Sequence, residues 1–134
     1  MKTKNFDDSE FTCHCGKCSF SQPFSGIVKD RLMIALQMVR DAYGMPIIVT
    51  SGRRCHTHNL EVGGVADSYH TQGMAADVKG ADMSRLLSCL LQVPDLHYIE
   101  PHDGYIHVDI GKMRKHRVND LRTSRRKLRG MLDA

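Results

Sequence analysis

The feature of the sequence that most constrains the fold is an amphipathic repeat over residues 27–43. Apolar side chains recur there at helical spacing, and Gly44 and Pro46 end the pattern, so we expect a helix. The segment 47–50 follows at once, and its β-branched residues predict a short buried strand. This order predicts a core in which a helix packs against a sheet.

Short strand and helix patterns then alternate along the chain. Three apolar segments are predicted to be strands, at residues 75–78, 96–99 and 105–110. Asp82 is suited to cap a second helix, which Pro94 ends, and the segment 101–104 is turn-like. Residues 53–73 contain three glycines and no clean period, which predicts a long ordered loop. We therefore predict an α+β fold, a single domain with helices flanking an antiparallel sheet.

The size and composition of the chain fit one globular domain. Its 134 residues provide for one hydrophobic core, and 41% hydrophobic and 25% charged residues are ordinary for a soluble protein. No apolar run reaches the ~20 residues that cross a bilayer, and the polar N-terminal segment has no signal-peptide pattern. We therefore expect synthesis in the cytoplasm without a signal peptide, and no membrane span.

Positive charge is concentrated at the C-terminal end. Residues 1–111 carry 10 Lys or Arg against 13 Asp or Glu, whereas residues 112–134 carry 9 against 2. We expect a domain over residues 1–111 and a basic tail over residues 112–134. Clustered positive charge attracts polyanions, such as nucleic acid, an anionic wall polymer or an acidic lipid surface.

The densest group of chemically active residues lies in segments 68–77 and 106–109. His70, Asp77 and His107 offer two imidazoles and one carboxylate, a set that holds zinc and leaves a fourth position for water. The predicted strands would carry Asp77 and His107 on rigid elements, and Gly73 permits a tight backbone path between His70 and Asp77. The sequence therefore predicts a zinc site at these residues.

A series of motifs in this order resembles one known family. The motifs are Ser51-Gly52-Arg53-Arg54-Cys55, His58-Asn59, Val62-Gly63-Gly64, the run from Ser68 to Asp77, and His107-Val108-Asp109. They resemble the zinc D-Ala-D-Ala carboxypeptidase family of peptidoglycan peptidases, the M15 metallopeptidases. The resemblance covers residues 11–111 and implies the α+β fold shared with hedgehog signalling domains.

The resemblance also implies roles for particular residues. It implies His70, Asp77 and His107 as zinc ligands, and Arg54 as the arginine that holds a peptide carbonyl or the substrate carboxylate. A guanidinium suits that work because its fixed charge and planar fork stabilise an oxyanion. The implied substrates are the stem or cross-link peptides of peptidoglycan.

The sequence leaves the general base open. Many family members carry an acid three residues before the last ligand, where this chain has Gly104. Asp103 is the first choice because a turn can re-aim it toward the metal, and His102 is second as a proton donor or oxyanion partner. Glu100 and Asp109 are alternatives, and Asp109 could instead orient an imidazole.

Five cysteines occur in the chain, and three of them cluster at Cys13, Cys15 and Cys18. With Cys55 or His14 as a fourth ligand, the cluster could bind a structural zinc. Ordinary reduced thiols packed in the fold are the alternative. The odd number and the missing export signal argue against a disulfide framework.

Three functions follow from these patterns. The first is a zinc peptidase that hydrolyses amide bonds in peptidoglycan peptides, as a D-Ala-D-Ala carboxypeptidase or an endopeptidase. A chain without an export signal would suit a phage endolysin or a virion component that reaches the cell wall by other means. The second is a non-catalytic zinc-containing binding module on the same fold, which Gly104 favours. The third is a nucleic-acid-binding protein, which lacks interleaved aromatic residues for base stacking.

Overall fold

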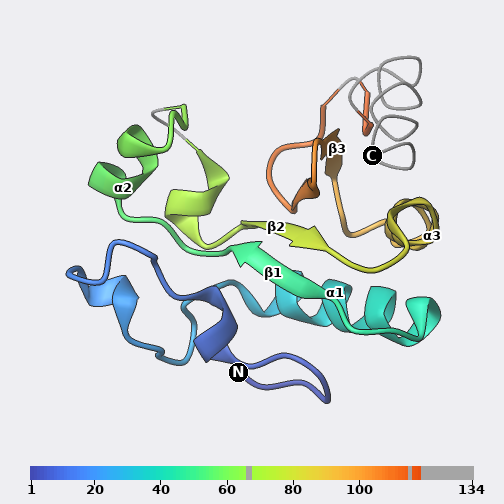
Figure 1. The fold of residues 1–134 in the computed structure, drawn as a ribbon, viewed down its shortest axis with the longest axis horizontal. Helices are drawn as coiled ribbons and strands as arrows, with labels where there is room; N and C mark the ends of the chain where they lie inside the picture. Colours follow the sequence, from blue (N-terminus) through green and yellow to red (C-terminus); the bar gives the residue numbers. More distant parts are fainter. Residues whose placement is uncertain (66–67, 115, 119–134) are drawn as a thin grey trace.

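The computed structural model describes residues 1–65, 68–114 and 116–118, and a four-stranded sheet forms its centre. The strands are β1 (Ile48–Ser51), β2 (Ala75–Lys79), β3 (Tyr98–His102) and β4 (Tyr105–Asp109). The helices are α1 (Asp30–Tyr43), α2 (His56–Glu61) and α3 (Met83–Leu91). The sheet is antiparallel throughout, in the order β1-β2-β4-β3. The predicted α+β fold with an antiparallel sheet is therefore confirmed (Figure 1).

One face of the sheet is apolar and belongs to the hydrophobic core. Side chains alternate between the two faces of a strand, so every second residue of β2, β4 and β3 points the same way. The residues on this face are fully buried, namely Ala76, Val78, Ile99, Ile106 and Val108. They pack in one cluster with Leu36 of α1 and Leu90 of α3. The opposite face carries polar residues.

The packing of α1 gives a test of this core. Leu36 is 0% exposed, whereas Met38, two residues along the same helix, is 51% exposed. We expect Leu36→Ala to lower the free energy of unfolding by about 2–5 kcal/mol, because it leaves a cavity. Met38→Ala should change it by less than about 0.5 kcal/mol. Urea denaturation of both variants measures the difference, and equal effects would contradict the assignment of the buried helix face.

The segment predicted as a loop over residues 53–73 contains helical turns. These are α2 and the 3₁₀ helix η3 (Tyr69–Gln72). The Cys55 side chain caps α2 by accepting a hydrogen bond from the His58 N–H, a role that sequence reasoning assigned to no cysteine. Both helices are too short to produce a visible period, which explains why the pattern predicted only a loop.

The β3–β4 hairpin differs from the expected turn over residues 101–104. Pro101 lies inside β3, and only Asp103 and Gly104 connect the two strands. A proline is tolerated there because β3 is an edge strand. No further strand of the described residues lies on its outer side, so no backbone hydrogen bond to such a strand is lost with the missing N–H. Gly104 has φ +83°, a conformation that a tight hairpin connection favours and glycine adopts freely.

The first residues of the predicted basic tail are bound to the domain. The Arg117 guanidinium donates hydrogen bonds to the carbonyls of four residues around the end of α3, Leu90, Leu91, Val93 and Leu96. Val118 forms a bridge with Ile99 of β3. Residue 115 and residues 119–134 lie outside the described part of the chain, so the polyanion contact expected of the tail stays a prediction. No helix in the described ranges is long and apolar enough to traverse a bilayer.

Candidate metal centre

The polar face of the sheet carries a row of side chains, one from each strand. The strand register pairs Ser51 with Asp77, Asp77 with His107, and His107 with Glu100. Directly opposed residues of antiparallel strands share a face, with Cβ atoms about 4.5–5.5 Å apart. The ladder therefore places His107 between two carboxylates, Asp77 on β2 and Glu100 on β3.

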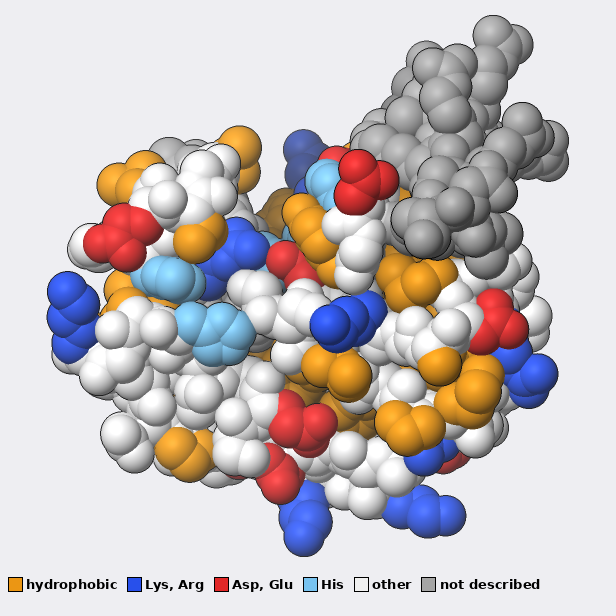
Figure 2. All heavy atoms as spheres, in the orientation of Figure 1, with side chains coloured by type: hydrophobic (Ala, Val, Ile, Leu, Met, Phe, Trp, Pro, Cys, Tyr) orange, Lys and Arg blue, Asp and Glu red, His pale blue; other side chains and the backbone are white. Residues whose placement is uncertain are grey.

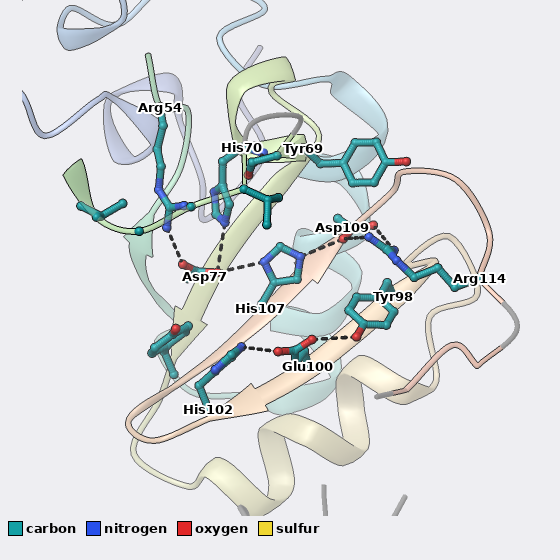
Figure 3. Close-up of a pocket in the computed structure, with 16 residues that line it drawn as sticks. Arg54, Tyr69, His70, Asp77, Tyr98, Glu100, His102, His107, Asp109 and Arg114 are labelled. Carbon is teal, nitrogen blue, oxygen red and sulfur yellow. Dashed lines mark hydrogen bonds and ion pairs between the residues drawn. The ribbon is translucent and has the colours of Figure 1, made fainter. Parts of the chain in front are cut away.

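The three predicted ligands converge on one point. His70 Nε2 and His107 Nδ1 each lie 3.2 Å from Asp77 Oδ1, and the three ligand atoms lie within 4.8 Å of one another. Donor atoms around a tetrahedral zinc, at ~2.0–2.1 Å from the ion, are about 3.3 Å apart. Figure 3 shows the two imidazoles and the Asp77 carboxylate pointing toward one another. The donor set and its spacing fit a zinc ion.

Hydrogen bonds from outside the group fix the protonation of both imidazoles. His70 Nδ1 lies 2.9 Å from the Gly52 carbonyl oxygen, and His107 Nε2 lies 2.8 Å from Asp109 Oδ2. Both oxygens accept, so these ring nitrogens carry the protons. In the neutral form of each ring, the lone pairs of His70 Nε2 and His107 Nδ1 face Asp77, as metal ligation requires.

The electrostatics of the group favour positive charge beside Asp77 and Asp109. Burial raises the pKa of Asp77, but the hydrogen bonds and charges of His107 and His70 hold it well below its ordinary value. Burial disfavours the charged form of His107, yet the hydrogen bonds to Asp109 and Asp77 raise its pKa to about 9. A metal ion would displace the proton that otherwise satisfies these acceptors.

A substitution of Asp109 tests whether its hydrogen bond with His107 Nε2 supports His107 as a metal ligand. Its carboxylate is fully buried and accepts from His107 Nε2, from Arg114 and from the Gly111 N–H. We expect Asp109→Asn to weaken zinc binding about 10- to 100-fold, because the amide cannot orient His107 and pair with Arg114 at once. Competition with a chromogenic chelator measures the affinity. An unchanged affinity would show that the hydrogen bond does not support the ligand.

A pocket of about 510 Å³ opens over the ligands, within the range of ~300–1,000 Å³ usual for binding sites. One wall is the segment from Val62 to Val65, which follows α2, and the other is the β3–β4 hairpin. Figure 2 shows the molecule hollowed between these two parts. Val62 and Val65 are exposed apolar residues, so one wall of the pocket is apolar and the floor is polar.

Arg54 lines the pocket and is held by three partners. Its Nε donates to Ser51 Oγ at 3.0 Å, and its two terminal nitrogens reach Asn59 Oδ1 at 3.3 Å and Asp77 Oδ2 at 3.2 Å. The guanidinium therefore holds the oxygen of Asp77 that does not face the imidazoles. Each terminal nitrogen has a second N–H to offer to a ligand in the pocket.

The structure separates the candidates for the general base. Asp103 is exposed at the tip of the hairpin and is not among the described residues that line the pocket, because the two-residue connection carries it past the end of the sheet. His102 lines the pocket, with its ring stacked on Tyr105. Glu100 lies in the row beside His107 and lines the pocket as well.

Glu100 is positioned by its two neighbours on β3. The Tyr98 hydroxyl donates to Glu100 Oε2 at 2.7 Å, and His102 Nε2 lies 2.9 Å from Glu100 Oε1 (Figure 3). Burial, together with the hydrogen bond to Glu100 and its charge, raises the pKa of Tyr98 to about 12, so this hydroxyl stays a donor at neutral pH. The carboxylate is thus aimed along the strand face that bears His107.

Sequence reasoning missed Arg114 as part of the site. Its guanidinium pairs with both oxygens of Asp109, at 3.1 and 3.3 Å, and lies 3.9 Å from the centre of the Tyr98 ring. Arg114 lines the pocket, although the sequence counted it among the basic residues of the tail. Its position five residues after Asp109, just beyond a predicted strand, was the only signal in the sequence.

Comparison with known proteins identifies the family of the chain. A family model described as Peptidase M15 matches residues 4–109. No curated protein matches the chain. The matched range includes every residue of the row and all three predicted ligands, and it ends at Asp109.

Proposed function

The chain belongs to the peptidase M15 family, which implies a metallopeptidase, and from this premise we propose that it hydrolyses amide bonds in peptidoglycan peptides with zinc as cofactor. The observation that supports the proposal most directly is the convergence of His70, Asp77 and His107 on the floor of the pocket. Beside them, Glu100 supplies a carboxylate on the same face of the sheet. Ligands and base thus share one rigid surface.

When bound, zinc would acidify a water molecule and polarise the amide carbonyl. Glu100 would accept a proton from a water molecule as the water oxygen bonds to the carbonyl carbon. The same carboxyl then delivers the proton to the amide nitrogen as the C–N bond breaks, which releases an amine and a carboxylic acid. Tyr98 and His102 hold Glu100 in place for both transfers.

Arg54 is proposed to stabilise the substrate oxygen while it orients Asp77. We expect Arg54→Ala to lower kcat/KM about 100-fold and to weaken zinc binding, because both the charge in the pocket and the partner of Asp77 are lost. Arg54→Lys should restore little, since an ammonium cannot reach Ser51, Asn59 and Asp77 together. Kinetics with saturating zinc separate the loss of catalysis from the loss of zinc affinity. Full activity of the lysine variant would contradict a role for the forked guanidinium group.

The proposed substrates are the stem or cross-link peptides of the bacterial wall. The pocket is open, and its exposed valines suit small side chains such as those of alanine. A wall-degrading enzyme of this size would serve as a phage endolysin or a virion component, acting after release from the cell that makes it. The basic tail over residues 112–134 is proposed to hold the enzyme near an anionic wall polymer.

Digestion of defined peptidoglycan fragments tests the proposed function. Purified protein with one zinc at the His70 site is incubated with disaccharide pentapeptides and with cross-linked dimers, and the products are identified by mass. Release of a terminal D-Ala indicates a carboxypeptidase, whereas a split inside the stem or bridge indicates an endopeptidase. No product from either substrate, with zinc bound and the protein folded, would refute the proposal.

The same experiment decides the second function, a zinc-containing module that binds without turnover. That reading depends on the missing acid at Gly104. Glu100 weakens it, because a carboxylate reaches the pocket from the neighbouring strand instead. The nucleic-acid alternative depends on tail residues that lie mostly outside the described ranges.

A further inference from the structure

We propose that Cys13, Cys15, Cys18 and Cys55 bind a second metal ion, a structural zinc held by four thiolates. All five cysteines are free, and the fifth, Cys89, lies apart on α3. The four sulfur atoms of the cluster lie within 4.8 Å of one another. The catalytic mechanism proposed above makes no use of them.

The spacing of the sulfur atoms fits a tetrahedral ion. Cys55 Sγ lies 3.9 Å from Cys13 Sγ and 3.9 Å from Cys15 Sγ. Four sulfurs at ~2.3 Å from a zinc ion are about 3.8 Å apart. A closed set of four protein ligands leaves no position for water, so the ion would be structural. His14, the other ligand considered from sequence, is exposed and outside the group.

The backbone around the cluster suits thiolates. The N–H groups of Lys17, Cys55 and His58 point at the sulfurs of Cys15, Cys13 and Cys55, with N to S distances of 3.5, 3.5 and 3.3 Å. Donors aimed at sulfur stabilise its anionic form, and several thiolates in contact require a cation. Gly16, with φ +74°, allows the chain to reverse between Cys15 and Cys18.

The ion would join two segments that are distant in sequence. Three of the ligands lie in the N-terminal segment, and Cys55 lies in the chain that leads from β1 to α2 (Figure 1). Backbone contacts already bring the segments together, since the Arg53 N–H donates to the Phe11 carbonyl at 2.8 Å and a Cβ on Gly52 would lie 2.5 Å from Phe11 Cα.

The joined chain also supports the catalytic site. Gly52 accepts from His70 Nδ1, the Arg54 N–H donates to the His70 carbonyl at 3.1 Å, and Cys55 is the residue after Arg54. A metal at the cysteines would therefore hold in place the segment that orients one zinc ligand and carries the pocket arginine. Its loss should lower the melting temperature as well as the activity.

Cobalt binding tests the second site independently of the peptidase function. In a His70→Ala/His107→Ala background, Co²⁺ is titrated into the reduced, metal-free protein and the sulfur-to-cobalt charge-transfer absorption is recorded. We expect the charge-transfer band to saturate at one equivalent of Co²⁺. Only thiolate ligands produce this band. Cys89→Ala, the matched control, should leave the band unchanged.

Variants of the cluster complete the test. Cys18→Ser should reduce the band by about a quarter, in proportion to the number of thiolates, and Cys15→Ser/Cys18→Ser should abolish tight binding. Should the Cys15→Ser/Cys18→Ser variant fail to fold, the zinc content of the purified proteins decides the question. We expect two equivalents of zinc in the native protein and one in the His70→Ala/His107→Ala protein. A folded protein without the thiolate band, or a band insensitive to both cysteine variants, would overturn the proposal.

Discussion

Replacing His70 with alanine should lower kcat/KM at least about 1,000-fold, since a zinc ion contributes several kcal/mol to stabilising the transition state. His70 is 3% exposed, and its Nε2 atom lies 3.2 Å from Asp77 Oδ1, so its imidazole is the donor that η3 contributes to the group. The variant should lose one equivalent of zinc. Kinetics on the peptidoglycan fragments and metal analysis of the same preparation measure both effects.

A matched histidine controls for the removal of an imidazole. His56 is exposed at the start of α2 and does not line the pocket, so His56→Ala should retain zinc and activity. The melting temperature of each variant shows whether the fold survives. Loss of this zinc with activity preserved would show that the metal centre does not serve hydrolysis.

Replacing Glu100 with glutamine should lower kcat by about 10²- to 10⁴-fold while zinc binding is preserved, because the amide cannot accept the proton. Glutamine keeps the size of the side chain and its place beside His107, so the pocket should keep its shape. KM should change little, since the substrate contacts remain. Steady-state kinetics and metal analysis of the variant separate proton transfer from metal binding.

Asp103→Asn is the matched control for Glu100. Asp103 was the first choice from sequence, and its exposed position at the hairpin tip predicts nearly native activity for this variant. The opposite result, with Asp103→Asn inactive and Glu100→Gln active, would mean that the hairpin rearranges when substrate binds and that the base comes from the turn.

The fold, and the residues that form the candidate metal group, could be predicted because their signals are local. The helical repeat before Gly44 marks α1, and Asp82 caps α3 with its side chain as expected. His70, Asp77 and His107 stand out because two imidazoles and a carboxylate, two of them on predicted strands, are donors that zinc prefers. The structure brings these three together.

The proposed proton acceptor, Glu100, could not be singled out because strand register is not visible in one sequence. The sequence shows Asp103 nearer to His107 along the chain than Glu100 is, but pairing across the hairpin reverses that order in space. Arg114 could not be assigned to the site either, because its contact with the Tyr98 ring depends on how the chain turns after β4. Proximity along the chain is a poor guide to neighbours across a sheet.

The row of side chains across the four strands also makes the site dependent on correct strand alignment. A shift of β4 by one residue against β2 would turn His107 inward and Ile106 outward. Such a misaligned sheet would bury an imidazole and a carboxylate among the core residues and expose apolar surface to water, at a cost of several kcal/mol. The packing energy that stabilises the fold therefore also selects the strand register that aligns the candidate metal ligands. Folded molecules will then have Asp77 and His107 on the same face of the sheet.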